Sequence, residues 1–169
     1  LGEAHFGFDT SAWFQRDVLL PFFKEHLKGA DEANLTRATM FETGSNRWRH
    51  FEAWPPKDTS RETLYLADDE KIVEQENNTG SSEYLSDPNK PVPHSAEISR
   101  GWDRPYMVED QRFTARRPDV LVFETDTLES DLTIAGAIDL NLWFATNKSA
   151  ADIVVKLVDV FPSIDENTN

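Results

Sequence analysis

The chain lacks cysteine altogether, has few basic residues for its acidic ones, and contains no long apolar run. Without cysteine it can form no disulfide, use no thiol nucleophile and build no cysteine-based zinc site. Lys and Arg number 17 against 31 Asp and Glu, so the formal net charge of −14 disfavours binding to nucleic acid or to an anionic membrane surface. No apolar run approaches the ~20 residues that a membrane-spanning helix needs. The composition therefore predicts neither a nucleic-acid nor a membrane partner, and it leaves the cellular compartment open.

The sequence patterns of common enzyme sites are also missing. There is no G-x-S-x-G nucleophile turn, no glycine-rich phosphate loop and no H-E-x-x-H zinc motif. The acidic run 68–70 lacks the spaced oxygen ligands of a calcium loop. The four histidines, His5, His26, His50 and His94, stand far apart. We therefore expect the chain itself to hold no catalytic residue, no metal ion and no cofactor.

What the chain does have is apolar and aromatic content, and its first pattern is helical. The hydrophobic fraction of 38% and the aromatic fraction of 11% predict a packed core. Apolar residues recur at helical spacing from Ser11 to Lys28, and Gly29 is a suitable stop. Pro21 falls inside this helix and should kink or divide it. So many large apolar side chains cannot be buried by one helix, so we expect it to pack on the rest of the chain or on a missing domain.

A β-hairpin is predicted over the next patterned stretch, Met40 to Pro56. Gly44 to Asn46 supplies the turn, and the double proline ends the returning strand. Trp48, Phe51 and Trp54 make this stretch unusually rich in large rings. Such rings pack in cores and domain interfaces, or they face a ligand, and the hairpin pattern alone is compatible with both.

The remainder of the chain predicts a sandwich of about seven strands with the helix in front. No internal repeat and no alternation of strands and helices is visible, which favours a mostly β fold of jelly-roll or immunoglobulin-like type. The polar, proline-rich stretch 74–100 is predicted to be a long, extended loop. Besides the hairpin, strands are predicted at residues 62–66, 71–73, 120–123, 133–146 and 153–161.

Opposite charges are concentrated around residue 110. Glu109 and Asp110 precede Arg112, Arg116 and Arg117, on what we expect to be a strand followed by a basic turn. The pattern predicts a fixed ion-pair network, and the alternative is the edge of a polar site.

A second group of rings is expected on a loop. Trp102, Asp103 and Tyr106 lie together in sequence, outside any predicted strand. Large rings on a loop often line a ligand pocket. We therefore predict Trp102, Asp103 and Tyr106 as candidate substrate-binding residues.

Several short motifs follow one another along the chain. They are R-D-V-L-L-P-F-F at 16–23, F-E-T-G-S-N-R-W at 41–48, W-P-P at 54–56, S-D-P-N-K-P-V-P at 86–93, E-D-Q-R-F at 109–113 and R-R-P-D-V-L at 116–121. In this order they resemble the CocE/NonD group of serine hydrolases. This group includes α-amino acid ester hydrolases, glutaryl-7-aminocephalosporanic acid acylases, cocaine esterase and relatives of X-Pro dipeptidyl-peptidase, and the first two are the most similar.

The resemblance implies a particular place in a larger protein. In that family an α/β-hydrolase domain carries the catalytic Ser, Asp and His, and a C-terminal jelly-roll domain packs on it. Residues 1–33 then correspond to the tail of the hydrolase domain, its closing helix included, and residues 34–169 to a jelly-roll-like β-sandwich that lacks its last strands. Leu1 is not an initiator methionine, so we expect the chain to begin part-way through its parent. None of the histidines stands in the family's G-P-W-x-x-H stretch, and His5 falls after its expected place.

The resemblance therefore implies a non-catalytic part of an ester- or amide-cleaving serine hydrolase. The parent is expected to be a secreted or periplasmic-type enzyme, and this chain alone should be inactive. Expected partners are the missing hydrolase domain, a small acyl ester or amide substrate in the parent, and a second copy of the chain through the exposed helix. Two alternatives are a purely structural domain and a carbohydrate-binding jelly roll, in which Trp48, Trp54 and Trp102 would stack on sugars.

Overall fold

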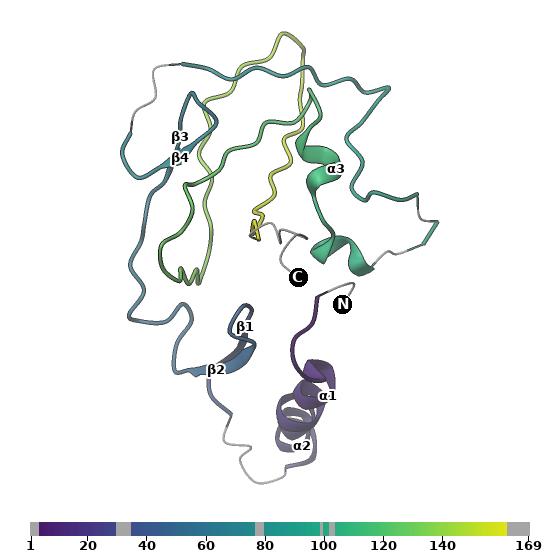
Figure 1. Cartoon of the computed structure of the whole chain (residues 1–169). Coiled ribbons are helices and arrows are strands. Elements are labelled where there is room, and N and C mark those ends of the chain that lie inside the picture. Colours follow the sequence, from purple (N-terminus) through teal and green to yellow (C-terminus); the bar gives the residue numbers. More distant parts are fainter. Residues whose placement is uncertain (1–3, 30–34, 77–79, 99, 102–103, 162–169) are drawn as a thin grey trace, which may run out of the picture. The chain divides into compact units, whose positions relative to one another are not determined.

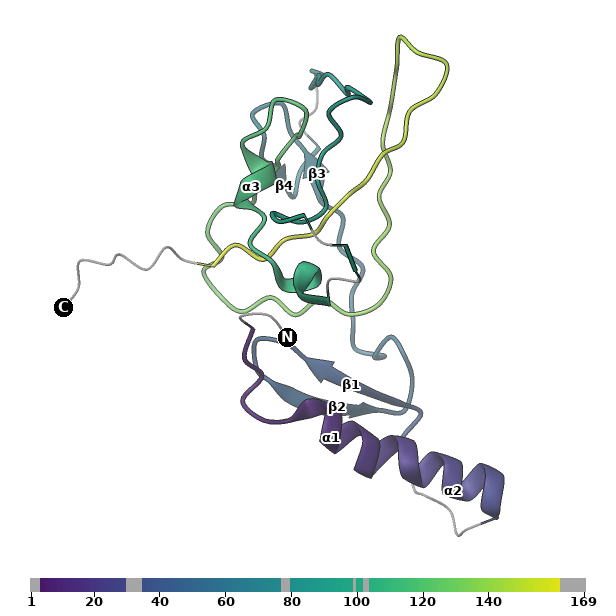
Figure 2. The same cartoon turned by 90° about the vertical axis from the view of Figure 1, so that its right-hand side faces the viewer.

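The computed structural model describes residues 4–29, 35–76, 80–98, 100–101 and 104–161. The chain separates into two compact units, Leu1–Ala137 and Ile138–Asn169, and each is described by itself. All the helices and strands named below belong to the first unit (Figures 1 and 2). No helix in the described ranges is long and apolar enough to cross a membrane.

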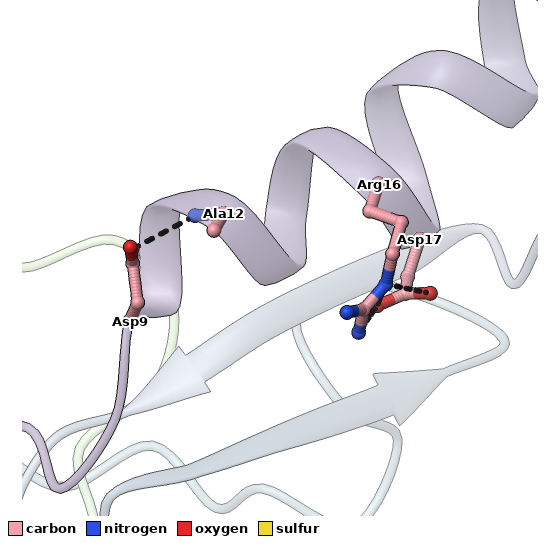
Figure 3. A network of polar contacts seen from close by, with 4 residues as sticks. All are labelled: Asp9, Ala12, Arg16 and Asp17. Atoms are coloured by element: carbon pink, nitrogen blue, oxygen red, sulfur yellow. Dashed lines mark hydrogen bonds and ion pairs between the residues drawn. The ribbon is translucent and has the colours of Figure 1, made fainter.

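The predicted helix is present, and it is divided just before Pro21, as the sequence predicts. It comprises α1 (Thr10–Phe14), a π-helical turn η1 (Gln15–Leu19) and α2 (Leu20–Lys28). Asp9 caps its start, because its carboxylate accepts the Ala12 N–H at 2.9 Å (Figure 3). Pro21 lies in the first turn of α2. An N–H in the first turn has no partner within the helix, so the N–H that proline lacks costs α2 no hydrogen bond there. Gly29 ends the helix with φ +61°, a left-handed conformation that suits glycine.

The predicted hairpin is confirmed. Strands β1 (Ala38–Glu42) and β2 (Arg47–Phe51) pair antiparallel, with Phe41 opposite Trp48. Gly44 and Asn46 have positive φ values of 83° and 54°, as the turn chemistry requires. The returning strand ends at Phe51, three residues before Trp54.

A second, smaller hairpin also agrees with the prediction, although its strands are short. Strands β3 (Tyr65–Leu66) and β4 (Ile72–Val73) pair antiparallel. Lys71 and Glu124 form a parallel bridge, in which the Ile72 N–H donates to the Glu124 carbonyl at 2.8 Å. The strand predicted at 120–123 is thus reduced to this one bridge, displaced by a residue.

The strand predicted around Glu109 and Asp110 is wrong. The structure has a 3₁₀ helix η2 (Arg104–Val108) and a short helix α3 (Arg112–Ala115) on either side of these residues. Asp110 accepts the Arg112 backbone N–H at 2.9 Å. This local bond to the residue two positions on favours a turn over an extended strand.

The strands predicted at 133–146 and 153–161 do not form in the described residues, which run there without regular structure. Strands need paired neighbours to satisfy their backbone groups, and their alternating apolar residues need a second layer. Here those side chains are exposed. They include Ile134, Ile138, Leu140, Leu142, Phe144, Val155 and Leu157.

The described chain is mostly non-helical, with antiparallel strands and a single long helical segment, in agreement with the predicted mostly β class. Its core is thin. Among the described residues, Ala67, Ser95 and Thr114 are the buried ones, with 5% to 7% of their surface exposed. Packing in the first unit therefore depends on half-buried rings and on polar contacts.

Candidate functional site

Of the three predicted substrate-binding residues, the structure describes Tyr106. Its side chain lies on η2 and is 38% exposed. The Tyr106 ring meets the His94 ring edge to face, with centroids 6.1 Å apart. Trp102 and Asp103 lie outside the described residues. The assignment of these three residues to a pocket wall thus remains a prediction. Of the three, the structure gives a position for the Tyr106 ring.

The question of core or ligand is answered for Trp48, which packs. The helix lies alongside the β1–β2 hairpin (Figure 2), and Trp48 is half-buried between them. Its ring is 4.5 Å from that of Trp13 with planes inclined by 21°, 5.8 Å from Phe14, and 5.2 Å from Phe41. Phe6 adds an edge contact to Phe41 at 5.6 Å. We call these five residues, Phe6, Trp13, Phe14, Phe41 and Trp48, the aromatic seam.

The remaining rings of the hairpin bear on the carbohydrate alternative. Trp54 is 43% exposed and meets Phe51 at 5.6 Å. A sugar site of the predicted kind needs an exposed row of rings, but Trp48 is covered by Trp13. One of the three rings proposed for sugar stacking is therefore used for packing within the chain.

A shallow groove lies beside the aromatic seam. Its volume is about 400 Å³, and its polar floor is formed by His50 together with two threonines. The His50 Nδ1 lies 3.3 Å from the Oγ1 atoms of both Thr36 and Thr39, which are themselves 3.2 Å apart. The groove is lined by Trp13, Asp17, Val18, Leu35, Thr36, Thr39 and His50.

This floor lacks the third member of a Ser-His-Asp type triad, the carboxylate that orients the histidine. Both hydroxyls share one ring nitrogen of His50, and no carboxylate bonds to that ring in the described part of the chain. Asp17 at the rim is held by Arg16, whose hydrogen bond lowers the pKa of the Asp17 carboxyl (Figure 3). An aspartate that is ionised and paired in this way cannot act as a general acid at neutral pH.

The predicted ion-pair network is replaced by two separate local pairs. Arg112 binds Asp110, and Arg117 binds Asp119 at 2.6 Å. Hydrogen bonds from these arginines lower the pKa of each carboxyl. Glu109 joins neither pair, because its Oε1 accepts the Ala96 N–H at 3.0 Å. The arrangement is therefore structural, and nothing in it brings free charges together at an open site.

Sequence reasoning missed two partners that define this geometry. Trp13 falls within the predicted helix and nothing in the sequence pattern singled it out, but the tertiary structure makes it the stacking partner of Trp48. Asp119 follows Arg117 by two residues within the quoted R-R-P-D motif, so the pair was visible in sequence as a local charge match. In the described ranges no three His, Asp or Glu residues come together as metal ligands.

Comparisons with known proteins give this geometry a context. The sequence model of the X-Pro dipeptidyl-peptidase C-terminal non-catalytic domain matches residues 29–169. Cocaine esterase of Rhodococcus sp. (strain MB1 Bresler) is 29% identical over an alignment of 153 residues, and the match covers 83% of this chain and 27% of that protein. The crystal structure of an aminopeptidase from a marine sediment Thaumarchaeota archaeon superposes with a TM-score of 0.62 and 36% identity, over 73% of this chain and 21% of that one.

These findings confirm the resemblance drawn from the short motifs. The chain spans about a quarter of the length of either relative, namely 27% and 21%. The match to the family covers most of the chain, and it includes the hairpin, the extended loop and the Arg117–Asp119 pair. The protein therefore belongs to the family of X-Pro dipeptidyl-peptidase C-terminal non-catalytic domains.

Proposed function

We propose that this chain is the C-terminal, non-catalytic part of a serine hydrolase that cleaves ester or amide bonds, and that it packs on the α/β-hydrolase domain of the same polypeptide. The observation that carries the proposal is the family match over residues 29–169. The relatives' names support the chemistry, since one is an esterase and the other an aminopeptidase. α-Amino acid esters and glutaryl-type amides are the substrate classes that the resemblance favours.

The helix supports the proposed division into two domains. The family match begins at residue 29, directly after α2, which supports a helix that belongs to the preceding domain and a boundary near the proposed 33/34. One side of the helix packs in the aromatic seam. The other side exposes large apolar residues beside charged ones, and an exposed apolar patch of this kind is typical of a surface that meets another domain. The exposed residues are Leu19, Leu20, Phe22, Phe23 and Leu27.

We assign this exposed side to the hydrolase domain. In the absence of that domain, a second copy of the chain is the next partner for the same side, which is the proposed route to a homo-oligomer. The loop with Trp102, Asp103 and Tyr106 is proposed to contribute to the wall of the acyl pocket in the parent. In that parent the catalytic Ser, His and Asp would lie outside this chain.

Activity measurements test the non-catalytic assignment. The purified chain is expected to hydrolyse p-nitrophenyl acetate no faster than buffer does and to show no titratable serine. The parent polypeptide should release p-nitrophenol with a burst equal to its concentration, as an acyl-enzyme predicts. A burst from the 169-residue chain itself would overturn the proposal.

Stability measurements test the docking side of the helix. Replacing Leu19 and Phe23 with serine should lower the melting temperature of the parent by several degrees, because those side chains would then be buried. In the chain alone, where both are at least 40% exposed, the same pair should have little effect. Equal effects in both proteins would show that this side of the helix does not meet another domain.

A further inference from the structure

The extended loop of the first unit is not held by apolar burial. Residues 80–98 run without helix or strand, and among them Asp87 is half-buried, Ser95 is buried and the others are exposed. Leu85 is 79% exposed and Ile98 is fully exposed. Because transfer of apolar surface from water is the usual force that fixes a segment, another interaction must define the position of this one.

Hydrogen bonds to charged side chains supply that interaction at three spaced points among the described residues. The Gly80 N–H donates to Asp68 Oδ1 at 3.0 Å. The Lys90 carbonyl accepts from Arg117 Nη2 at 3.1 Å. The Ala96 N–H donates to Glu109 Oε1 at 3.0 Å. In each case the loop contributes a backbone group and a distant element contributes a charge, which makes the bonds stronger than neutral ones.

Each tether has a geometric constraint of its own. At Gly80 a Cβ would lie 2.7 Å from Asp68 Oδ2, so a larger residue here would push that carboxylate away from its present position. Arg117 is oriented by two bonds to Asp119, from Nε at 2.8 Å and from Nη2 at 2.6 Å. The Glu109 Oε2 is buried without a hydrogen-bond partner in the described chain, so Ala96 is what orients that carboxylate.

The residues with the least exposure lie at these anchor points. Ala67 precedes the Asp68 tether, and Ser95 precedes the Ala96 tether. Thr114 accepts the Arg117 N–H at 3.0 Å through its carbonyl and thereby holds the third anchor. The elements that hold the segment are therefore tethered next to the best-packed positions of the described chain.

We infer that residues 80–98 form a strap, fastened by the side chains of Asp68, Arg117 and Glu109, and that its C-terminal end positions the Tyr106 ring through His94. The last tether, at Ala96, lies two residues from His94, whose ring meets Tyr106 at 6.1 Å. The strap and its tethers are properties of this chain and do not depend on the hydrolase that we propose as its parent.

Amide hydrogen exchange of the full 169-residue chain, read by NMR, tests the tethers one at a time. In Asp68→Ala the Gly80 amide should exchange about tenfold faster or more, and in Glu109→Ala the same should hold for the Ala96 amide. Glu109→Gln and Asp68→Asn keep an acceptor oxygen and should retain most of the protection. Asp126→Ala, which removes an exposed carboxylate bound to Lys71, is the matched control and should leave both amides unchanged.

Two further readouts separate a positioning role from a general loss of structure. The cross-relaxation between the His94 and Tyr106 rings should disappear in Glu109→Ala and persist in Glu109→Gln and Asp126→Ala. The chemical shift of the Ala96 amide should change in Glu109→Ala, whereas that of the Asn89 amide, which bonds to Asp87 within the strap, should not. Unprotected Gly80 and Ala96 amides in the native chain, or a ring contact that survives Glu109→Ala, would overturn the inference.

Discussion

The indole of Trp13 lies face to face with that of Trp48, at 4.5 Å between centroids and 21° between planes. Trp13 belongs to α1, ahead of the family match, and Trp48 belongs to β2 within it. The contact fixes the helix on the hairpin and gives a small region of dense ring packing to a chain with few buried residues. Stacked rings of this kind add to the energy of burial alone.

The first prediction concerns this contact. Trp13→Ala should lower the free energy of unfolding by about 2 kcal/mol, through lost burial and lost stacking on Trp48. Urea unfolding followed by tryptophan fluorescence would measure the change. Leu27→Ala is the control, because Leu27 lies on α2 and is 74% exposed, so it should cost little in this chain. A Trp13→Ala variant as stable as Leu27→Ala would show that the stacking does not hold the helix.

The helix cap gives a second prediction. Asp9→Ala removes the acceptor for the Ala12 N–H and should destabilise the helix by about 1 kcal/mol. Circular dichroism at 222 nm during thermal unfolding would report the loss. Asp9→Asn keeps a capping oxygen and should behave like the unaltered chain. If alanine and asparagine at position 9 act alike, the cap contributes nothing.

A third prediction follows from the Arg117–Asp119 pair. The hydrogen bond from Arg117 holds the pKa of the Asp119 carboxyl below its usual range. Since the folded-state pKa is depressed, the stabilisation is fully present above the ordinary aspartate pKa of about 3.9 and is lost as the pH falls through the lower folded-state value. Arg117→Ala should bring the pKa of Asp119 back up toward the ordinary value, as ¹³C NMR of the carboxyl carbons would show. Asp110, whose pKa is lowered by Arg112, should not respond.

The fourth prediction tests the proposed pocket wall in the parent enzyme. Tyr106→Ala should raise KM for the acyl substrate by on the order of threefold to tenfold with little change in melting temperature, if the ring contacts substrate. Tyr84→Ala is a matched control, because Tyr84 is 39% exposed on the strap and is not a predicted site residue. Identical kinetics for both variants and the unaltered enzyme would remove Tyr106 from the pocket.

Local chemistry made the first third of the chain predictable. The hairpin followed from a turn that needs Gly44 and from the prolines that end the second strand. The division of the helix followed from the absence of an N–H on Pro21. These features are decided by residues close together in sequence, so a pattern can reveal them.

Elsewhere the secondary-structure prediction failed for two reasons. Some segments depend on contacts with residues far away in the sequence, and others are decided by a single side-chain hydrogen bond. Alternation at 133–146 and 153–161 indicates strands, but a strand forms only with paired neighbours, and none is present there in the described residues. The strand expected at Glu109 and Asp110 was overruled by a side-chain bond within the turn. Whether Trp48 faces core or ligand depended on Trp13, 35 positions earlier, and no pattern within the hairpin could show it. Trp102 and Asp103 remain predictions.

The aromatic seam has a consequence for how this domain can be moved between enzymes. The stretch that the family shares starts at residue 29, yet Phe6, Trp13 and Phe14, which cover the hairpin, come before it. The segment that matches the family therefore begins later in the sequence than the segment that packs together around the hairpin. In a chimaera joined at residue 29, Phe41 and Trp48 would lose the aromatic rings that pack on them. A fusion between relatives should therefore be joined upstream of Phe6.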